Sequence, residues 1–268
     1  MIQLNNAVMR EIEKVSEVSQ YLWQREWAER NGGNISVDVT DLFDEIPQVD
    51  AQEKALPLQL QLPMESANRI YYVKGTGQRI RELRDPDYAG CVLKINAAAN
   101  GYQIIWGGKA SEDFAPTSEF ISHIKILVEK KKAGSDHKSV VHTHPLELIA
   151  LSHHPDISKS SELFTHTCWK MLPEVRAFVP RGIGMIPYCL PSSEELADGT
   201  TAALLQHDVA IWEKHGATAS GADVLQAFDY VDVANKGAKL YLMCTSAGYE
   251  PEGVTKENMD ILKREFNL

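Results

Sequence analysis

The chain has 268 residues, of which 44% are hydrophobic and 24% charged, as is typical of a globular protein long enough to bury a substantial core. Its formal net charge of −10 argues against nucleic acid and anionic membrane surfaces as main partners, because both require a basic face. A small anionic ligand stays possible, since backbone amides, hydroxyls and helix N-termini can hold phosphate.

The cysteines and the first residues both indicate a cytoplasmic protein. Four cysteines lie far apart and form no Cys-x-x-Cys pair, so we expect reduced thiols. They are Cys91, Cys168, Cys189 and Cys244. Apolar residues among the first twenty recur at helical spacing between glutamates, unlike a signal peptide. No apolar stretch approaches the roughly 20 residues that a transmembrane helix needs.

The first expected element is an amphipathic helix over residues 7–30, where apolar side chains recur every three or four positions and end in an aromatic group. Asn31-Gly32-Gly33-Asn34 ends this N-terminal helical region of residues 1–30. The alternation over residues 35–39 then predicts a half-buried strand.

Strands are expected next. Residues 41–68 are poorly periodic, and only the Leu-Gln-Leu-Gln-Leu stretch at 58–62 suggests an edge strand. Apolar and aromatic runs predict further strands at 70–73, 91–95 and 103–106.

A helix should follow Pro116-Thr117-Ser118-Glu119 and end at Gly134. Thr117 or Ser118 can cap its free amides, and Glu119 complements the helix dipole. The later expectations are a short helix at 145–151, buried strands at 175–179, 183–187 and 209–212, and helices at 192–207, 222–246 and 256–266. Ser192 and Glu195 form a capping box for the helix at 192–207.

Helices and strands alternate without a linker or repeat, so we expect one α/β domain over residues 1–268. This pattern alone favours a parallel sheet.

His142-Thr143-His144, at the end of an apolar run, is the most specific signal for chemistry. Side chains alternate across a strand, so both imidazoles project from one face and can reach one metal ion. An isolated pair is more often simply polar residues at a sheet edge. His215, which follows the run at 209–212, is modestly preferred as a third ligand over the other candidates, His137, His153, His154, His166 and His207. Three protein ligands leave the open position typical of a catalytic zinc.

Two glutamates could carry protons near such a metal. Glu119 is one, although a first-turn glutamate is usually a solvated partner of the helix dipole. Glu174, before the run at 175–179, is the other, and it could equally be a surface residue. Lys74, Lys94 and Lys109 could in principle form a Schiff base, but nothing local marks any of them as desolvated.

Three short segments could hold an anion. Asn31-Gly32-Gly33-Asn34, Gly75-Thr76-Gly77 and Pro116-Thr117-Ser118-Glu119 are small, polar and placed at element junctions. Glycines let backbone amides approach an anion, and the polar side chains add neutral donors. Each segment alone is a weak signal, because a turn that needs a positive φ explains it more simply.

The order of these pieces resembles the class II aldolase/adducin family over nearly the whole chain. An Asn-Gly-Gly-Asn turn follows an aromatic helix, then come Gly-Thr-Gly, Pro-Thr-Ser-Glu, His-x-His and a distant His-Gly. Trp23, Trp27, Glu29 and Arg30 before the first turn are most similar to one bacterial branch of the family. The chain is also long for the fuculose- and ribulose-phosphate branches.

This resemblance implies a three-layer α/β/α domain with a largely antiparallel sheet, and a homotetramer with active sites at subunit interfaces. His142, His144 and His215 match the zinc ligands, Glu119 the acid/base carboxylate, and Glu174 a second acidic residue near the metal. The positions that match phosphate-binding residues are Asn31, Gly33, Asn34, Thr76, Gly77 and Ser118. Thr76 stands where serine is expected, which keeps the hydroxyl and adds a methyl group.

The implied activity is zinc-dependent cleavage of a ketose 1-phosphate between carbons three and four, which releases dihydroxyacetone phosphate. Zinc stabilises the enediolate as a Lewis acid, no Schiff-base lysine is required, and Glu119 protonates carbon three. A fuculose-phosphate aldolase or a pentulose-phosphate 4-epimerase would use the same metal. A non-catalytic adducin-like interaction domain is disfavoured, since it has no need of three histidines and Glu119, and a zinc hydrolase with three histidine ligands stays open.

Overall fold

A computed structural model describes residues 2–48, 52–55 and 62–267 of the chain. Within these residues, the centre of the fold is one nine-stranded sheet in the order β2-β5-β4-β3-β1-β6-β9-β8-β7. The strands are β1 (Asn34–Asp38), β2 (Lys54–Ala55), β3 (Ile70–Lys74), β4 (Gly90–Ile95), β5 (Gly101–Gly107), β6 (Ser139–Thr143), β7 (Ile183–Ile186), β8 (Val209–Trp212) and β9 (Gly216–Gly221). Apart from Leu62, the edge strand predicted at 58–62 lies outside the described residues.

The pairing of the strands decides between the two expectations for the sheet. All neighbouring strands run antiparallel except β7 and β8, which are parallel. The largely antiparallel sheet implied by the family resemblance is therefore confirmed. The parallel sheet that the alternation of elements favoured is wrong, because several consecutive strands are joined by short connections instead of crossover helices.

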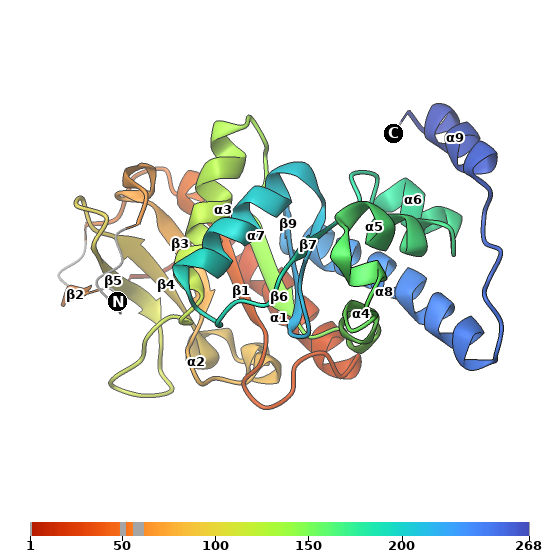
Figure 1. The fold of residues 1–268 in the computed structure, drawn as a ribbon. Coiled ribbons are helices and arrows are strands. Elements are labelled where there is room, and N and C mark those ends of the chain that lie inside the picture. The colour runs from red at the N-terminus through yellow and green to blue at the C-terminus, as the bar shows by residue number, and fades with distance from the viewer. Residues whose placement is uncertain (1, 49–51, 56–61, 268) are drawn as a thin grey trace.

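Helices cover both faces of the sheet (Figure 1). They are α1 (Asn6–Gln24), α2 (Pro86–Ala89), α3 (Phe120–Lys132), α4 (Leu146–Ser152), α5 (Ser161–Trp169), α6 (Pro173–Phe178), α7 (Glu194–Gln206), α8 (Val224–Ser246) and α9 (Lys256–Glu265). Short 3₁₀ turns are η1 (Thr40–Leu42), η3 (Met64–Ser66), η4 (Ile80–Arg84) and η5 (Ile157–Lys159). Helices α3 and α7 pack on one face, and α1, α4 and α8 on the other, which makes three layers. No helix in the described part of the chain is both long and apolar enough to cross a membrane.

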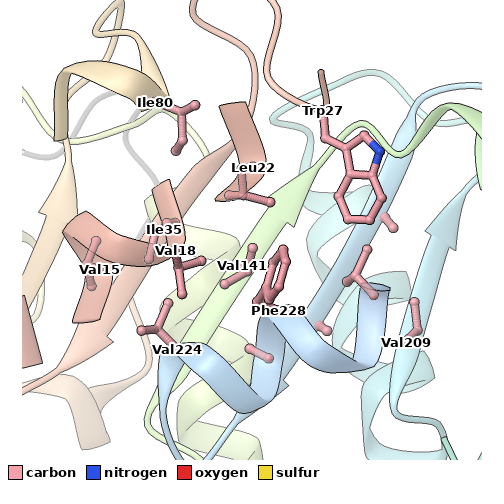
Figure 2. Close-up of a cluster of buried hydrophobic side chains, with 14 of the residues drawn as sticks. Val15, Val18, Leu22, Trp27, Ile35, Ile80, Val141, Val209, Val224 and Phe228 are labelled. Atoms are coloured by element: carbon pink, nitrogen blue, oxygen red, sulfur yellow. The ribbon is translucent and has the colours of Figure 1, made fainter. Parts of the chain in front are cut away.

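Helix α1 forms as its sequence pattern predicts, but it is shorter. Asn5 caps it by accepting a hydrogen bond from the Val8 amide. Its buried stripe packs with α8 against the sheet: in Figure 2, Val18 and Leu22 lie close to Ile35 of β1. The helix ends at Gln24 and not at residue 30, because the backbone then turns and Trp27 packs against Phe228 of α8.

One segment was misread from the sequence, and others, including α5 and β9, were not predicted. Residues 175–179 were expected to be a strand, but α6 occupies this region, with a proline at its first position and Val175 and Val179 buried one turn apart. A short apolar run has no periodicity that separates these states. The strand β9 was missed, because its sequence, Gly-Ala-Thr-Ala-Ser-Gly, lacks large apolar side chains even though all six residues are buried.

Candidate active site

A pocket of about 150 Å³ opens at the ends of three neighbouring central strands, where β3 and β6 end and β1 begins. Its wall consists of Asn31, Gly32, Gly33, Asn34, Lys74, Thr76, Gly77, Thr117, Ser118, Glu119, His142, His144 and His215. Asn34 pairs with His142 across the β1–β6 ladder, so the first turn and the histidine pair lie side by side. Of the residues to which the family resemblance assigns a role, all line this pocket except Glu174.

Three histidines form the one group in the described residues whose side chains could together hold a metal ion. The ligand atoms of His142, His144 and His215 all lie within 4.8 Å of one another. His142 belongs to β6, His144 follows that strand, and His215 lies in the turn between β8 and β9. The pairing of β6 with β9 brings this turn beside the end of β6. The five competing histidines do not line the pocket.

Neighbouring groups set the orientation of two rings. His142 Nδ1 lies 3.1 Å from the Ala217 carbonyl oxygen, and His144 Nδ1 lies 2.6 Å from Oε1 of Glu29. Each Nδ1 is therefore placed to donate its proton, which leaves the Nε2 lone pair as the free ligand atom. The Trp212 ring stacks on His142 at a centroid distance of 4.0 Å and restricts its rotation further.

The charge states of His142 and His215 suit a divalent cation. Burial lowers the pKa of His142 well below its usual value, with the neighbouring histidines acting in the same direction. Burial, together with His144, lowers the pKa of His215 to about 4. Neutral imidazoles bind metals, whereas imidazolium ions do not. Three imidazole donors that face a pocket fit zinc and related divalent ions.

Glu119 lies beside the triad and is shielded from solvent. It occupies the position just before α3, is only 7% exposed, and accepts a hydrogen bond of 2.7 Å from Nδ2 of Asn34. Burial raises the pKa of its carboxyl group, against the opposing effects of Asn34, His144 and Lys74. Its Oε2 lies 3.9 Å from Nε2 of His142. Glu119 is therefore not a solvated partner of the helix dipole, which is the usual role of a glutamate in the first turn.

Glycine is required at the turns around the pocket. Gly33 and Gly77 have φ values of 72° and 71°, a region that side chains disfavour. A Cβ at Gly32 would come within 2.9 Å of the His144 ring. The turns are also joined to each other, since the Thr117 amide donates to the Lys74 carbonyl oxygen at 2.9 Å. Backbone amides and small polar side chains therefore surround one small space.

The structure adds information on several polar residues that the sequence alone did not provide. Glu174 is exposed on α6 and does not line the pocket of its own chain. Lys74 is 2% exposed and lines the pocket, although nothing in the sequence marked it as desolvated. The cap of α7 is Ser193, and Ser192 instead donates a hydrogen bond to Oγ of Ser118.

Four further residues that line the pocket or orient its histidines were not predicted as site residues from the sequence. Gly32 and Thr117 line the pocket, and the sequence indicated them only as members of the two anion-binding segments Asn31-Gly32-Gly33-Asn34 and Pro116-Thr117-Ser118-Glu119. Glu29, which orients His144, was noticed only as part of the family resemblance, because its contact joins residues that are distant in sequence. Trp212 gave no local signal beyond its place in an apolar run.

The chain is similar to known proteins over most of its length. The family model described as Class II Aldolase and Adducin N-terminal domain matches residues 13–242. A rhamnulose-1-phosphate aldolase of Bacteroides thetaiotaomicron is 43% identical over 264 residues, which cover 98% of this chain and 96% of that protein. One from Klebsiella pneumoniae is 30% identical over 249 residues, which cover 92% and 89%. The crystal structure of a sugar-phosphate aldolase from Thermotoga maritima superposes with a TM-score of 0.77 at 30% identity, covering 92% of this chain and all of that one.

Proposed function

Because this chain belongs to the class II aldolase and adducin family, we propose that it is a zinc-dependent aldolase that cleaves L-rhamnulose 1-phosphate. The products are dihydroxyacetone phosphate and L-lactaldehyde, in a step of rhamnose catabolism. The observation that carries this proposal is the triad of imidazoles beside buried Glu119 in a pocket lined by phosphate-sized turns. The two rhamnulose-1-phosphate aldolases that resemble the chain over nine-tenths of its length support the choice of substrate.

The histidine triad would hold the metal. His142, His144 and His215 would hold a zinc ion, which would supply Lewis-acid stabilisation of negative charge on substrate oxygen atoms. Glu29 and the Ala217 carbonyl group keep two of these rings in the tautomer that leaves Nε2 free. With charge stabilised in this way, the reaction needs no Schiff-base lysine.

Glu119 would move the proton at carbon three of dihydroxyacetone phosphate. Asn34 donates a hydrogen bond to Oε2 of this carboxylate, which fixes the orientation of the group beside the imidazoles. Its raised pKa suits a residue that alternates between acid and base. In cleavage it protonates the enediolate carbon, and in synthesis it removes the same proton.

Neutral donors would bind the phosphate group. The turn segments that line the pocket contribute amides and hydroxyl groups, as expected for an anion site on an acidic protein. The residues in this role are Asn31, Gly33, Asn34, Thr76, Gly77 and Ser118. The methyl group of Thr76, where the family pattern has serine, leaves its hydroxyl available.

The decisive experiment compares substrates. Dihydroxyacetone phosphate release should be clearly faster, as kcat/KM, from L-rhamnulose 1-phosphate than from L-fuculose 1-phosphate, measured with a coupled reductase. Equal values for the two sugars would contradict the narrower substrate. Release from neither, together with epimerisation of a pentulose phosphate, would favour the epimerase branch. A zinc-loaded protein inactive on all of these would favour an interaction domain.

We also propose that the chain forms one domain over residues 1–268 and assembles as a homotetramer with active sites at subunit interfaces. The shared sheet supports the single domain. Glu174 supports the assembly, because it is exposed and outside the pocket of its own chain, and an acidic residue matching it belongs near the metal in the family. Glu174 of a neighbouring subunit would then complete each site. The cytoplasmic location stays a prediction.

Mixed tetramers provide a test of this arrangement. Glu119→Gln and Glu174→Gln proteins, each with low activity, should regain activity when co-expressed, because some interfaces then combine an intact Glu119 with an intact Glu174. Random assembly predicts roughly a quarter of the parent activity. Mixing Glu119→Gln with His215→Ala is the control, since one subunit supplies both of these groups and no interface is repaired. Absence of recovery in verified mixed tetramers would contradict the shared site.

A further inference from the structure

Ser192 has a backbone conformation that is unusual for a residue with a side chain. Its φ is 63°, in the left-handed region that serine rarely adopts. The Ser193 amide donates to the Leu190 carbonyl oxygen at 3.1 Å, so residues 190–193 form a β-turn with Pro191 at its second position. A turn with proline second and a positive φ third is of type II, in which glycine is the preferred third residue. Serine at this position therefore carries backbone strain that glycine would avoid.

The hydroxyl group of Ser192 reaches a residue of the pocket wall. It donates a hydrogen bond of 3.0 Å to Oγ of Ser118, which lies 74 residues earlier in the chain. Ser118 lines both the active-site pocket and a small cleft between the first turns of α3 and α7, whereas Ser192 lines the cleft and not the pocket. Ser192 therefore contacts Ser118 from behind the pocket, outside the space that a substrate would occupy.

Contacts between α3 and α7 hold the turn in this place. Nζ of Lys125 on α3 lies 2.8 Å from a carboxylate oxygen of Asp198 and 3.2 Å from one of Glu194, both on α7. The side chain of Ser193 caps the first turn of α7. The start of α7 is therefore tied to α3, and the turn that precedes α7 is kept against Ser118.

The direction of the hydrogen bond decides what Ser118 can offer to a ligand. A serine hydroxyl has one proton to donate and two lone pairs that accept. Because Ser118 accepts from Ser192, its own proton stays free, and its side chain has no other hydrogen-bond partner among the described residues. Phosphate oxygen atoms need donors, and a hydroxyl group that already accepts a hydrogen bond is the stronger donor. The contact therefore prepares Ser118 to donate into the pocket.

Building on the phosphate role proposed above for Ser118, we propose that Ser192 is a positioning residue for the binding of the substrate phosphate. Its hydroxyl group fixes the Ser118 hydroxyl as a donor. The strain at Ser192 is retained because glycine, which would relieve it, cannot make this hydrogen bond. Ser192 acts through Ser118 and does not itself touch the substrate.

Ser192→Gly is the most informative variant, because it removes the hydroxyl group and relieves the strain together. Its unfolding temperature should equal or exceed that of the parent. The Kd for inorganic phosphate, measured by calorimetry on the metal-loaded protein, should nevertheless rise roughly two- to tenfold, the range of one lost hydrogen bond. The KM for L-rhamnulose 1-phosphate should rise by a similar factor with little change in kcat, since the phosphate group does not react. A purely structural turn residue would not combine kept stability with weaker phosphate binding.

Ser192→Ala separates the hydroxyl group from the strain. Alanine lacks the hydroxyl and keeps the left-handed penalty, so phosphate affinity should fall as in Ser192→Gly without a rise in unfolding temperature. Asn68→Gly is the matched control, since Asn68 is exposed, has a φ of 60° and does not line the pocket. It should bind phosphate like the parent. Parent-like affinity in both Ser192 variants would overturn the proposal, as would a loss in Ser192→Ala that Ser192→Gly does not share.

A double-mutant cycle tests whether Ser192 acts through Ser118. In a Ser118→Ala background, Ser192→Gly should leave the Kd for phosphate unchanged, because the acceptor of the hydrogen bond is already gone. An equal effect of Ser192→Gly in the presence and absence of the Ser118 hydroxyl would refute this route.

The outcomes also separate this inference from the proposed function. Weaker phosphate binding in Ser118→Ala but not in Ser192→Gly would refute the positioning role alone. Unchanged binding in Ser118→Ala, or a parent that binds no phosphate, would refute the phosphate role of Ser118 and this inference with it. A protein that fails to cleave L-rhamnulose 1-phosphate, yet gives the expected cycle with inorganic phosphate, would refute the substrate and retain the positioning role.

Discussion

Glu119→Gln should keep its bound metal and lose most of its turnover, roughly 10²- to 10⁴-fold, the usual contribution of a positioned acid or base. The glutamine has nearly the same size and retains an oxygen that can accept from Asn34, so the pocket should keep its shape. It has no proton to exchange at carbon three. Dihydroxyacetone phosphate release and metal content, measured on the same preparation, check this expectation.

A partial reaction isolates the proton step. In heavy water the parent should exchange one proton at carbon three of dihydroxyacetone phosphate without an aldehyde, and the Glu119→Gln protein should not. Glu112→Gln is the matched control, because Glu112 is exposed and does not line the pocket. Parent-like turnover in the Glu119 variant would mean that another group carries the proton.

Loss of the third histidine should abolish both metal binding and catalysis. His215 is half-buried and follows the end of β8, so His215→Ala should disturb folding less than replacement of His142 inside β6. Lewis-acid stabilisation is worth several kcal/mol, and each 1.4 kcal/mol is a factor of ten, so activity should fall more than about a hundredfold. Metal content by elemental analysis and kcat/KM should fall together.

Chelation should reproduce this loss in the parent protein. Added zinc should restore the chelated parent but not His215→Ala at the same concentration. His153→Ala, which removes an exposed histidine outside the pocket, should bind metal and turn over like the parent. Full activity after verified removal of the metal would exclude the metal-dependent mechanism.

Strongly periodic segments were predictable from the chain, and weakly patterned ones were not. The helix α3 and the strands β3, β4 and β6 follow the expected runs within a residue or two. The small residues of β9 gave no signal, because their burial follows from close packing against α8 and not from their own hydrophobicity. Helix α6 was mistaken for a strand, since four apolar residues within five positions are too few to define a period.

The candidate site shows the same division. The pair His142 and His144 was readable because strand alternation alone places both imidazoles on one face. The choice of His215 over five other histidines was not readable from spacing, since it depends on β9 pairing with β6. The family order suggested it, and the 4.8 Å cluster confirms that these three side chains meet.

The sequence by itself determined the kinds of donors: imidazoles at alternate strand positions, and glycines and small polar residues at turns. These depend on side-chain chemistry and local backbone preference, which each short segment carries within itself. Only the tertiary structure decided that Lys74 is desolvated, that Glu119 is held by Asn34, and that Glu174 lies outside the pocket of its own chain. Burial and partner geometry are properties of what packs against a residue, and those neighbours come from distant parts of the chain.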